Sequence, residues 1–436
     1  MGARETALNV LIACRRDGAW SNGVLKEYLT RDHLEGREAA LATRLCYGVL
    51  QNRLRLDFYL KQLLTGRSEK LHPVIHDILH LGLYQIYDLE RIPDSAAVNE
   101  SVALARKYCP KQKYASGLVN GVLRSAVRTK GTLREPTSLE DRYSHPWPLI
   151  ALLRESIGKN RIETMLRANN CAPETVIQVN TRKITTEALE RQLISRGVQV
   201  NRHGWMTDCL VLGGTGAMEK LPEFRDGLFY VQDPAAKLAV LCADIHENDR
   251  VLDCCAAPGG KSFAASMLLR SGSITSCDIH PHKVSLIESG ARRLGIVFLQ
   301  ARLQNAAEFV PEWEGKMNVV LVDVPCSGYG IIRKKPDIRY KKPEDMEQLP
   351  GLQSEILENQ SRYVAPGGVL LYSTCTLLHR ENEDVVKAFL EKHPEFTAET
   401  PVLPEKFPQF TDPWLTLVPG EYDTDGFFIC RLRRSL

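Results

Sequence analysis

The sequence lacks the features that mark membrane and secreted proteins. No apolar run in its 436 residues approaches the roughly 20 residues of a membrane-spanning helix, and no signal-peptide-like segment opens the chain. Its 12 cysteines are scattered, and no two form a Cys-x-x-Cys pair. This spacing argues against a zinc ribbon and against a disulfide framework. Free thiols favour a reducing compartment, so we expect a cytoplasmic protein with no membrane partner.

A large charge of one sign is also missing. The formal net charge is +3, with 25% charged and 44% hydrophobic residues, which is typical of a soluble globular protein. So small an excess is no evidence for a nucleic-acid partner, and any such inference must rest on local clusters of charge. The chain is longer than a domain with a single hydrophobic core usually is, so we expect two or three domains.

Residues 1–135 are predicted to form a helical bundle. Apolar residues recur at helical spacing in several segments of this part: 6–13, 40–50, 74–87, 99–105 and 118–123. Its predicted outer side carries a set of basic residues: Arg53, Arg55, Arg106, Lys107, Lys111, Lys113, Arg124 and Arg128. These charges fit either contact with an RNA backbone or an ordinary solvated helix face, and the charges alone leave both interpretations open.

Three histidines, His72, His76 and His80, follow one another at intervals of four on one predicted helix. This spacing can gather imidazoles around a metal ion. No carboxylate or thiol in the pattern completes a recognisable ligand set, so we expect a structural helix face and no metal.

Two further domains are predicted after the linker at 131–148, which contains glycine and proline. Residues 140–225 combine a strand at 176–180, a helix at 186–196 and a strand at 199–202, which indicates a small α+β module. From 226 to 436, helices alternate with predicted strands: 250–254, 274–278, 297–300, 317–323, 369–373 and 426–431. This alternation is typical of a doubly wound, mostly parallel sheet.

Cys326 and Cys375 each come just after an apolar run that is predicted to be a buried strand. Open α/β sheets bind their ligands at the carboxyl ends of the strands. A lone cysteine is more often a small buried residue. Two thiols at one edge, with Asp323 close to Cys326 in the sequence, favour sulfur chemistry on a bound substrate.

A tight turn of small residues follows the first strand of this predicted sheet. Gly259 and Gly260 allow close approach of a ligand, and the next helix offers its N-terminal N–H groups to an anion. Asp278 ends the following strand, where an acid can bind ribose hydroxyls. A nucleotide-triphosphate loop is disfavoured because Cys255 occupies its first glycine position, and the dinucleotide motif Gly-x-Gly-x-x-Gly is absent. S-adenosylmethionine fits best, and a plain β–α turn is the alternative.

Several motifs together resemble the RNA cytosine-C5 methyltransferases of the Nop2/Sun type: Asp253-Cys-Cys-Ala-Ala-Pro-Gly-Gly-Lys261, Asp323-Val-Pro-Cys-Ser-Gly328, Ser373-Thr-Cys-Thr376, Arg333-Lys-Lys-Pro-Asp337 and Asp425-Gly-Phe-Phe428. The helical third resembles a NusB-type RNA-binding domain in three segments: Leu81-Gly-Leu-Tyr-Gln85, Ile92-Pro-Asp-Ser-Ala-Ala-Val-Asn-Glu100 and Val119-Asn-Gly-Val-Leu-Arg124. The resemblance implies an all-α NusB-like bundle, a small α+β module and a Rossmann-like class I methyltransferase domain.

The resemblance also implies the residues that contact S-adenosylmethionine. Asp278 is expected to bind its ribose, and Asp323 also borders the cofactor. Asn305 stands where the family has an acid that contacts the adenine side, so the contact there is changed. The turn itself supplies the remaining contacts: Cys255, Ala256, Ala257, Pro258, Gly259, Gly260 and Lys261.

By the same resemblance, Cys375 is the nucleophile that adds to C6 of cytosine, and Cys326 assists release of the product. Asp323 is expected to contact the N3 and N4 edge of the base, in a neutral form maintained by burial. The basic stretch 333–342 is expected to bind RNA phosphates. The implied substrate is 16S ribosomal RNA. The alternatives are transfer RNA or another RNA, and a non-catalytic RNA-binding ribosome assembly factor; oligomeric state is not predicted.

Overall fold

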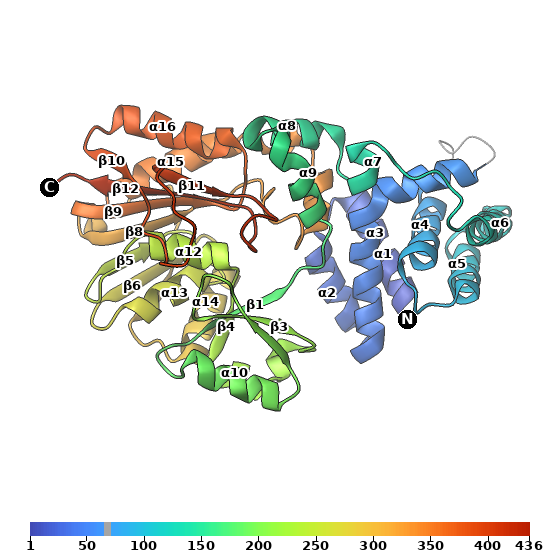
Figure 1. Ribbon diagram of the computed structural model, residues 1–436, viewed down its shortest axis with the longest axis horizontal. Coiled ribbons are helices and arrows are strands. Elements are labelled where there is room, and N and C mark those ends of the chain that lie inside the picture. The colour runs from blue at the N-terminus through green and yellow to red at the C-terminus, as the bar shows by residue number, and fades with distance from the viewer. Residues whose placement is uncertain (65–70) are drawn as a thin grey trace. The chain divides into compact units, whose positions relative to one another are not determined.

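The computed structural model describes residues 1–64 and 71–436, so residues 65–70 of the predicted helical third lie outside it. The chain divides into two compact units, each described separately below (Figure 1). The first comprises residues 1–152 together with the segment 334–341, and the second comprises residues 153–333 and 342–436. The predicted bundle therefore receives a piece of chain that interrupts the sequence of the second unit.

The first unit, which we call the helical unit, is built from helices, as predicted: α1 (Ala3–Asp17), α2 (Ser21–Arg31), α3 (Gly36–Leu63), α4 (Pro73–Asp88), α5 (Asp94–Tyr108), α6 (Ala115–Arg128) and α7 (Leu139–Tyr143). Local sequence sets several of their ends. Helix α1 stops at Gly18, which adopts the left-handed conformation that glycine tolerates. Helix α4 begins at Pro73, because proline has no N–H to lose at the first helical position.

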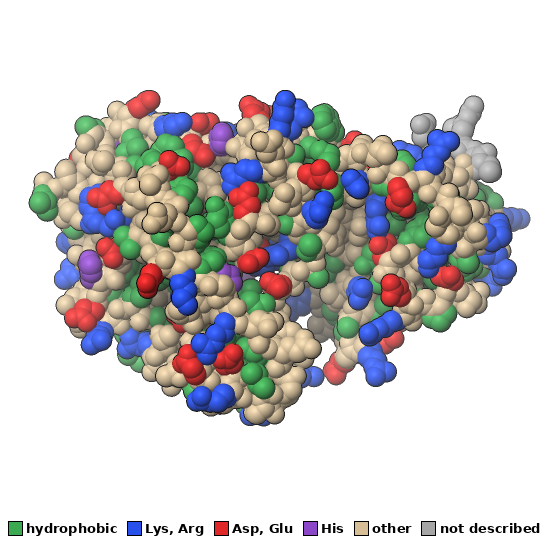
Figure 2. Space-filling model, viewed as in Figure 1, with side chains coloured by type: hydrophobic (Ala, Val, Ile, Leu, Met, Phe, Trp, Pro, Cys, Tyr) green, Lys and Arg blue, Asp and Glu red, His purple; other side chains and the backbone are tan. Residues whose placement is uncertain are grey.

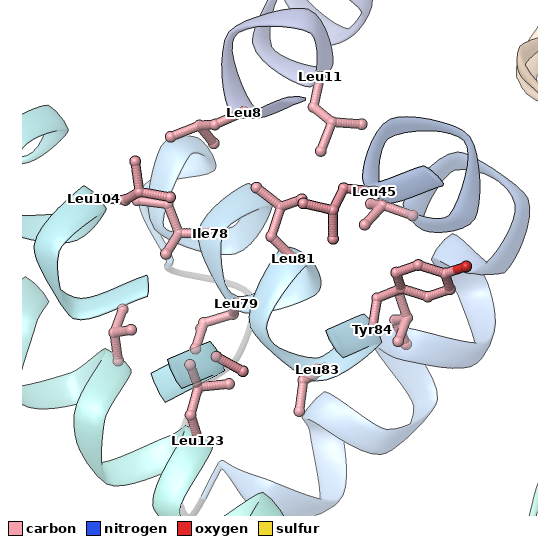
Figure 3. Close-up of a cluster of buried hydrophobic side chains, with 14 of the residues drawn as sticks. Leu8, Leu11, Leu45, Ile78, Leu79, Leu81, Leu83, Tyr84, Leu104 and Leu123 are labelled. Atoms are coloured by element: carbon pink, nitrogen blue, oxygen red, sulfur yellow. The ribbon is translucent and has the colours of Figure 1, made fainter. Parts of the chain in front are cut away.

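Helix α4 forms the centre of this unit and is buried on nearly all sides. Figure 3 shows its leucines and Ile78 pointing toward side chains of the surrounding helices, among them Leu45 of α3 and Leu123 of α6. Neighbouring helices approach closely because α4 has a glycine on its packed side. A Cβ at Gly82 would lie 2.5 Å from a methyl carbon of Leu123.

The segment 334–341 is held inside the helical unit by buried polar contacts. The backbone N–H and the hydroxyl of Ser21 both donate to the Asp337 carboxylate, at 3.1 and 2.9 Å. Arg339 donates to the backbone carbonyls of Gln51 and Ser144, at 2.8 and 3.1 Å. Burial lowers the pKa of Arg339 to about 10. The expectation that this stretch binds RNA phosphates is therefore wrong for Arg339, whose guanidinium is used inside the protein.

The predicted basic side of the bundle is partly neutralised. Arg55 pairs with Asp88, and Lys107 pairs with Glu5 at 2.6 Å. Arg53 lies over the ring of Tyr340. Figure 2 shows Lys and Arg side chains interspersed with acidic ones on the visible face of this unit. The charges available to a nucleic acid are thus fewer than the sequence suggests.

The second unit begins within α8 (Trp147–Ile157) and continues with α9 (Lys159–Ala168) and a small antiparallel sheet in the order β2-β3-β1-β4. Strands β1 (Thr175–Val179) and β2 (Gln199–Arg202) and the helix α10 (Thr186–Ser195) agree with the prediction. Strands β3 (Cys209–Gly213) and β4 (Phe229–Val231) were not predicted. The predicted α+β module is thus present, with two strands that complete its sheet.

The larger sheet of the second unit has the order β10-β12-β9-β8-β5-β6-β7, and β11 pairs with β12. Neighbouring strands from β9 to β7 run parallel, whereas β12 runs antiparallel to β9. Its strands are β5 (Arg250–Asp253), β6 (Ser273–Asp278), β7 (Leu299–Leu303), β8 (Met317–Asp323), β9 (Val364–Thr374), β10 (Phe396–Glu399), β11 (Trp414–Leu417) and β12 (Phe427–Arg434).

Helices cover both faces of this sheet, as Figure 1 shows: α12 (Pro234–Cys242), α13 (Gly260–Leu268) and α14 (Pro281–Leu294) lie on one face, and α15 (Leu349–Ser361) and α16 (Glu383–Lys392) on the other. The short helix α11 (Pro222–Arg225) precedes β4. The doubly wound fold predicted from the alternating pattern is confirmed. Within the described residues, no helix has both the length and the apolar character needed to cross a membrane.

Candidate active site

The carboxyl ends of five parallel strands meet at one edge of the large sheet, which we call the catalytic edge. Strand β5 has β6 on one side and β8 on the other, although β8 comes three strands after β5 in the chain. Open α/β sheets bind ligands where the strand order reverses in this way. Asp253, Asp278 and Asp323 are the last residues of β5, β6 and β8. Cys375 directly follows β9.

The two cysteines predicted to act together are in contact. The Sγ atoms of Cys326 and Cys375 lie 3.2 Å apart, and both residues are partly exposed. The hydrogen bond to Cys375 and burial both raise the pKa of the Cys326 thiol well above its usual range. Cys326 therefore keeps its proton, and its S–H can donate to the sulfur of Cys375.

A salt bridge lies at the same edge, between the first helix turn of α13 and the end of β8. Lys261 Nζ is 2.7 Å from Asp323 Oδ2, and the Ser373 hydroxyl donates to Asp323 Oδ1 at 2.8 Å. Burial opposes the charge on Lys261, but the Asp323 carboxylate outweighs it and the pKa of Lys261 is raised. Both carboxylate oxygens of Asp323 thus have a partner within the protein, and the neutral form expected for this residue stays a prediction.

The small-residue turn after β5 is fixed by hydrogen bonds beneath it. Asp253 is fully buried and accepts a hydrogen bond from the Ser262 hydroxyl at 2.7 Å. Burial raises the pKa of Asp253 to about 6. Gly259 has a φ of 111°, which an L-residue with a side chain rarely adopts, and a Cβ there would lie 2.3 Å from the Phe263 ring. In a nucleotide-triphosphate loop, the lysine and the serine at these positions contact the phosphates and their metal ion. Here Lys261 is bound to Asp323 and Ser262 to Asp253, which argues against such a loop.

Asp278 is the last residue of β6, and Asn305 comes shortly after the neighbouring strand β7. Asp278 is buried, and its Oδ1 accepts the backbone N–H of His280 at 3.0 Å. Asn305 Oδ1 accepts the N–H of Ala307 at 3.1 Å, and its amide nitrogen donates to Glu308. The amide of Asn305 is thus engaged by its own turn, which offers a structural reason for an uncharged residue at this position.

A set of buried polar residues that the sequence analysis missed connects the Cys326 loop to the Cys375 loop. The carboxylate of Glu381 is fully buried; its Oε2 accepts hydrogen bonds from the Ser327 N–H and the Gln353 side chain, both at 2.9 Å. Gln353 also donates to the carbonyl of Pro325. The hydroxyls of Ser327 and Thr376 are 2.7 Å apart. Glu381 lies only six residues after Cys375, and this proximity in sequence was the one available signal.

The backbone of two glycines connects these loops to β12. Gly330 N–H donates to the Cys375 carbonyl at 2.9 Å, and Gly426 N–H donates to the Gly330 carbonyl at 2.8 Å. A Cβ at Gly426 would lie 2.6 Å from the Gly330 Cα, so only glycine fits. Arg333 approaches the Asp425 carboxylate to 3.5 Å. Arg333, like Arg339, is thus engaged inside the protein.

Three protein families match successive parts of the chain. The family described as 16S rRNA methyltransferase RsmB/F matches residues 240–433, and the NusB family matches residues 1–128. A ferredoxin-like domain of RsmF/B-like methyltransferases matches residues 145–219. The NusB-like bundle, the small α+β module and the methyltransferase fold predicted from the sequence are all confirmed.

Two solved structures have a fold similar to that of this chain. The structure titled "Crystal Structure of PH0851" superposes with a TM-score of 0.80 at 25% identity and covers 98% of each chain. The structure of NSun6 from Pyrococcus horikoshii with SFG has a TM-score of 0.60 at 20% identity, covering 67% of this chain and 98% of its own. The second likeness concerns the fold alone.

Curated relatives match over nearly the whole length. A probable ribosomal RNA small subunit methyltransferase B from Bacillus subtilis is 36% identical, covering 99% of this chain and 98% of its own. The ribosomal RNA small subunit methyltransferase B of Vibrio cholerae is 32% identical, covering 93% of this chain and 92% of its own. With this identity over the full length, and with all three of its parts matched in order, the chain belongs to the ribosomal RNA small subunit methyltransferase B family.

Proposed function

We propose that this protein transfers a methyl group from S-adenosylmethionine to C5 of a cytosine in 16S ribosomal RNA, through a covalent bond between Cys375 and C6 of the base. Family membership supports methylation of ribosomal RNA. The observation that carries the finer proposal is the 3.2 Å contact between the sulfurs of Cys326 and Cys375, beside the Lys261–Asp323 salt bridge.

The residues at the catalytic edge fit S-adenosylmethionine. One carboxylate oxygen of Asp278 accepts the His280 N–H, and we assign the other oxygen to the ribose hydroxyls. The glycine turn Gly259–Gly260 and the N-terminus of α13 suit the amino-acid end of the cofactor, and Asn305 borders the adenine side. When bound, S-adenosylmethionine supplies an electrophilic methyl group on a sulfonium. Because Lys261 and Ser262 are already engaged, a triphosphate is a poorer fit.

Cys375 is the better nucleophile of the two cysteines. Cys326 keeps its proton and can donate it toward Cys375, and a hydrogen bond of this kind stabilises a thiolate on the acceptor. The ammonium of Lys261 adds a positive charge whose interaction with Cys375 contributes to the raised pKa of Lys261. A neighbouring cation favours a thiolate, so Cys375 is the sulfur that adds to the base.

The chemical steps follow from a thiolate at this position. The Cys375 sulfur forms a bond to C6, and the electrons of the C5–C6 double bond make C5 a nucleophile that takes up the methyl group. The proton on C5 then passes to a water molecule, the electrons of its C–H bond form the C5–C6 double bond again, and the C6–S bond breaks with its electrons returning to the Cys375 sulfur. Cys326 lies against the same sulfur and assists this release. The target base must leave its stack to reach the two thiols.

Asp323 orients the base. Its carboxylate is fixed by Lys261 on one oxygen and Ser373 on the other, so its position is set before the substrate arrives. A carboxyl oxygen of Asp323 can accept a hydrogen bond from the exocyclic N4 amine of cytosine, and uracil has no amine at that position. Asp323 therefore supports the choice of cytosine.

A covalent trap tests this proposal. Cys326→Ala should accumulate an RNA–protein adduct that survives denaturing electrophoresis, because the bond to Cys375 forms but release is slowed. Cys375→Ala should give no adduct and no methylation, and Cys171→Ala, at an exposed cysteine outside the site, should behave as wild type. A Cys375→Ala enzyme that still methylates RNA would reject the covalent step.

Mapping of 5-methylcytosine in RNA from cells with and without the gene tests the substrate. We expect one 16S cytosine to lose its methyl group and to regain it with the wild-type gene, whereas the Cys375→Ala gene should not restore it. Loss of methylation in transfer RNA with unchanged 16S RNA would point to the alternative substrate. Unchanged methylation in every RNA would favour the non-catalytic assembly factor.

A further inference from the structure

Three side chains of the helical unit form a cluster that the proposed reaction does not use. His76 and His80 lie one turn apart on α4, and Asp57 comes from the neighbouring helix α3. Both imidazole Nε2 atoms face Asp57 Oδ1, at 2.8 Å from His76 and 2.9 Å from His80. The three ligand atoms all lie within 4.8 Å of one another.

Asp57 supplies the carboxylate whose absence argued against a metal in the sequence. Histidines at positions i and i+4 of a helix place two nitrogen atoms on one face, as zinc sites on helices require. Zinc binds nitrogen and oxygen at about 2.0–2.2 Å, so two ligands of a tetrahedral ion stand about 3.3 Å apart. The contacts of 2.8 and 2.9 Å need to widen by only about half an ångström to admit an ion.

Burial in the cluster differs from one ligand to the next. The side chain of His80 is 2% exposed, whereas those of His76 and Asp57 are 27% and 24% exposed. One ligand is therefore fixed in the core and two are open to solvent, which leaves a way in for an ion and for a water molecule as a fourth ligand. This arrangement has the form of a three-ligand site with an open position.

The backbone of α3 suggests what an ion here would do. Asn52 has φ and ψ angles of −112° and 15°, which are not helical, so the part of α3 that carries Asp57 is set off from the part before it. Packing and side-chain contacts hold this second part of α3 to α4. An ion shared by Asp57, His76 and His80 would join the two helices directly.

We propose that Asp57, His76 and His80 bind one divalent transition-metal ion of the zinc type, which fastens the second part of α3 to α4. The alternative is a hydrogen-bonded His–Asp–His cluster that needs no metal. In that case both imidazoles donate to one carboxylate oxygen and the cluster is complete as it stands. The two differ in whether an ion binds and in whether binding stabilises the protein.

The experiment uses the full-length protein without an affinity tag, treated with a chelator and dialysed. Titration with ZnCl₂ in a calorimeter should show one site in wild type. Asp57→Asn and His76→Ala should bind zinc at least about tenfold more weakly. His72→Ala is the matched control, because His72 precedes the same helix but lies outside the cluster, and it should bind as wild type. His76 is chosen over His80 because it is partly exposed, so its loss leaves the core intact.

Two further readouts separate a site from incidental binding. Cobalt(II) should give the visible absorption of a tetrahedral site in wild type and His72→Ala, and not in Asp57→Asn. Saturating zinc should raise the thermal midpoint of wild type and His72→Ala by several degrees, with little effect on Asp57→Asn. Equal zinc affinity in wild type and in Asp57→Asn would overturn the proposal. A titration in which wild type shows no single zinc site would overturn it as well.

Discussion

At the scale of single residues, buried charges at the catalytic edge divide into two kinds. Lys261 and Asp323 form an ion pair, with 2.7 Å between Nζ and Oδ2. Asp253, by contrast, forms no ion pair with any described residue and accepts one hydrogen bond from Ser262. Its burial raises its pKa, which means that its ionised form costs stability.

Replacing Asp253 with asparagine should therefore stabilise the protein at neutral pH. The usual pKa of 3.8 rises to about 6 in the folded state, so stability is lost as the pH increases from about 4 to about 6. The D253N variant avoids this loss, and its amide keeps an acceptor oxygen for the Ser262 hydroxyl. We expect D253N to gain on the order of 1–3 kcal/mol at pH 8, seen as a thermal midpoint a few degrees above wild type.

The comparison is made at two pH values and with one control. At pH 4 the midpoints of wild type and D253N should agree, because Asp253 is then protonated in the folded state. Asp412→Asn alters an exposed aspartate and should leave the midpoint unchanged at both pH values. A D253N midpoint below that of wild type at pH 8 would show that the ionised form is stabilised by its surroundings.

At the scale of elements, the spacing of the two cysteines depends on the buried acid that follows them. The Cys326 loop follows β8 and the Cys375 loop follows β9, and Glu381 is hydrogen-bonded to the first loop and to α15 through Ser327 and Gln353. The Tyr372 hydroxyl on β9 donates to the Glu381 carbonyl at 2.6 Å. A single residue thus connects two strand ends and a covering helix.

Glu381→Ala should reduce catalysis more than substrate binding. It leaves the Ser327 N–H without an acceptor and removes one of the two acceptors of the Gln353 amide, so the Cys326 loop is held less firmly beside Cys375. We expect kcat to fall on the order of 10- to 100-fold, with a smaller change in KM, in methylation assays on 16S RNA. Glu381→Gln keeps one acceptor oxygen and should lose less.

The control for this pair is Glu391→Ala, which removes an exposed acid from α16 and should leave both constants unchanged. The yield of adduct in a Cys326→Ala background adds a second measurement, since a misplaced Cys375 forms the bond to C6 more slowly. Wild-type kcat in Glu381→Ala would mean that β8 and β9 alone fix the two thiols.

At the scale of the whole molecule, the chain leaves the second unit at Arg333, contributes residues 334–341 to the helical unit, and returns at Lys342. This segment begins eight residues after Cys326. Asp337 and Arg339 obtain their buried partners from residues of the helical unit, namely Ser21, Gln51 and Ser144. A chain without the helical unit lacks these partners.

A shortened protein that begins at Leu153 should therefore expose the Arg339–Tyr340 bond to trypsin. In the full-length protein Arg339 is 1% exposed and this bond should resist cleavage. The bond after Arg270 lies in an exposed loop of the second unit and should be cut equally in both proteins, which makes it the internal control. Mass spectrometry of early digests measures both sites, and equal resistance at Arg339 would contradict the role given to the helical unit.

Much of the catalytic edge was predictable because its residues follow from local sequence. Strand β8 was predicted with the bounds Met317–Asp323 that the structure shows. Parallel strands place their carboxyl ends on one side, so Asp323, Cys326 and Cys375 were expected near one another. Strands β10 and β11 were not predicted, because they have four residues each and are defined by pairing with β12. Strand β7 lies two to three residues later than predicted.

The sequence by itself determined the alternation of strands and helices, the helical nature of the first third, and the presence of two thiols and an acid after buried strands. These follow from periodicity and from short motifs, which are local properties of the chain. Only the tertiary structure decided that Glu381 fixes the Cys326 loop, that Arg339 serves the helical unit, and that Asp57 completes the histidine pair. Each of these depends on residues brought together by packing, and such contacts leave no periodic signal in the sequence.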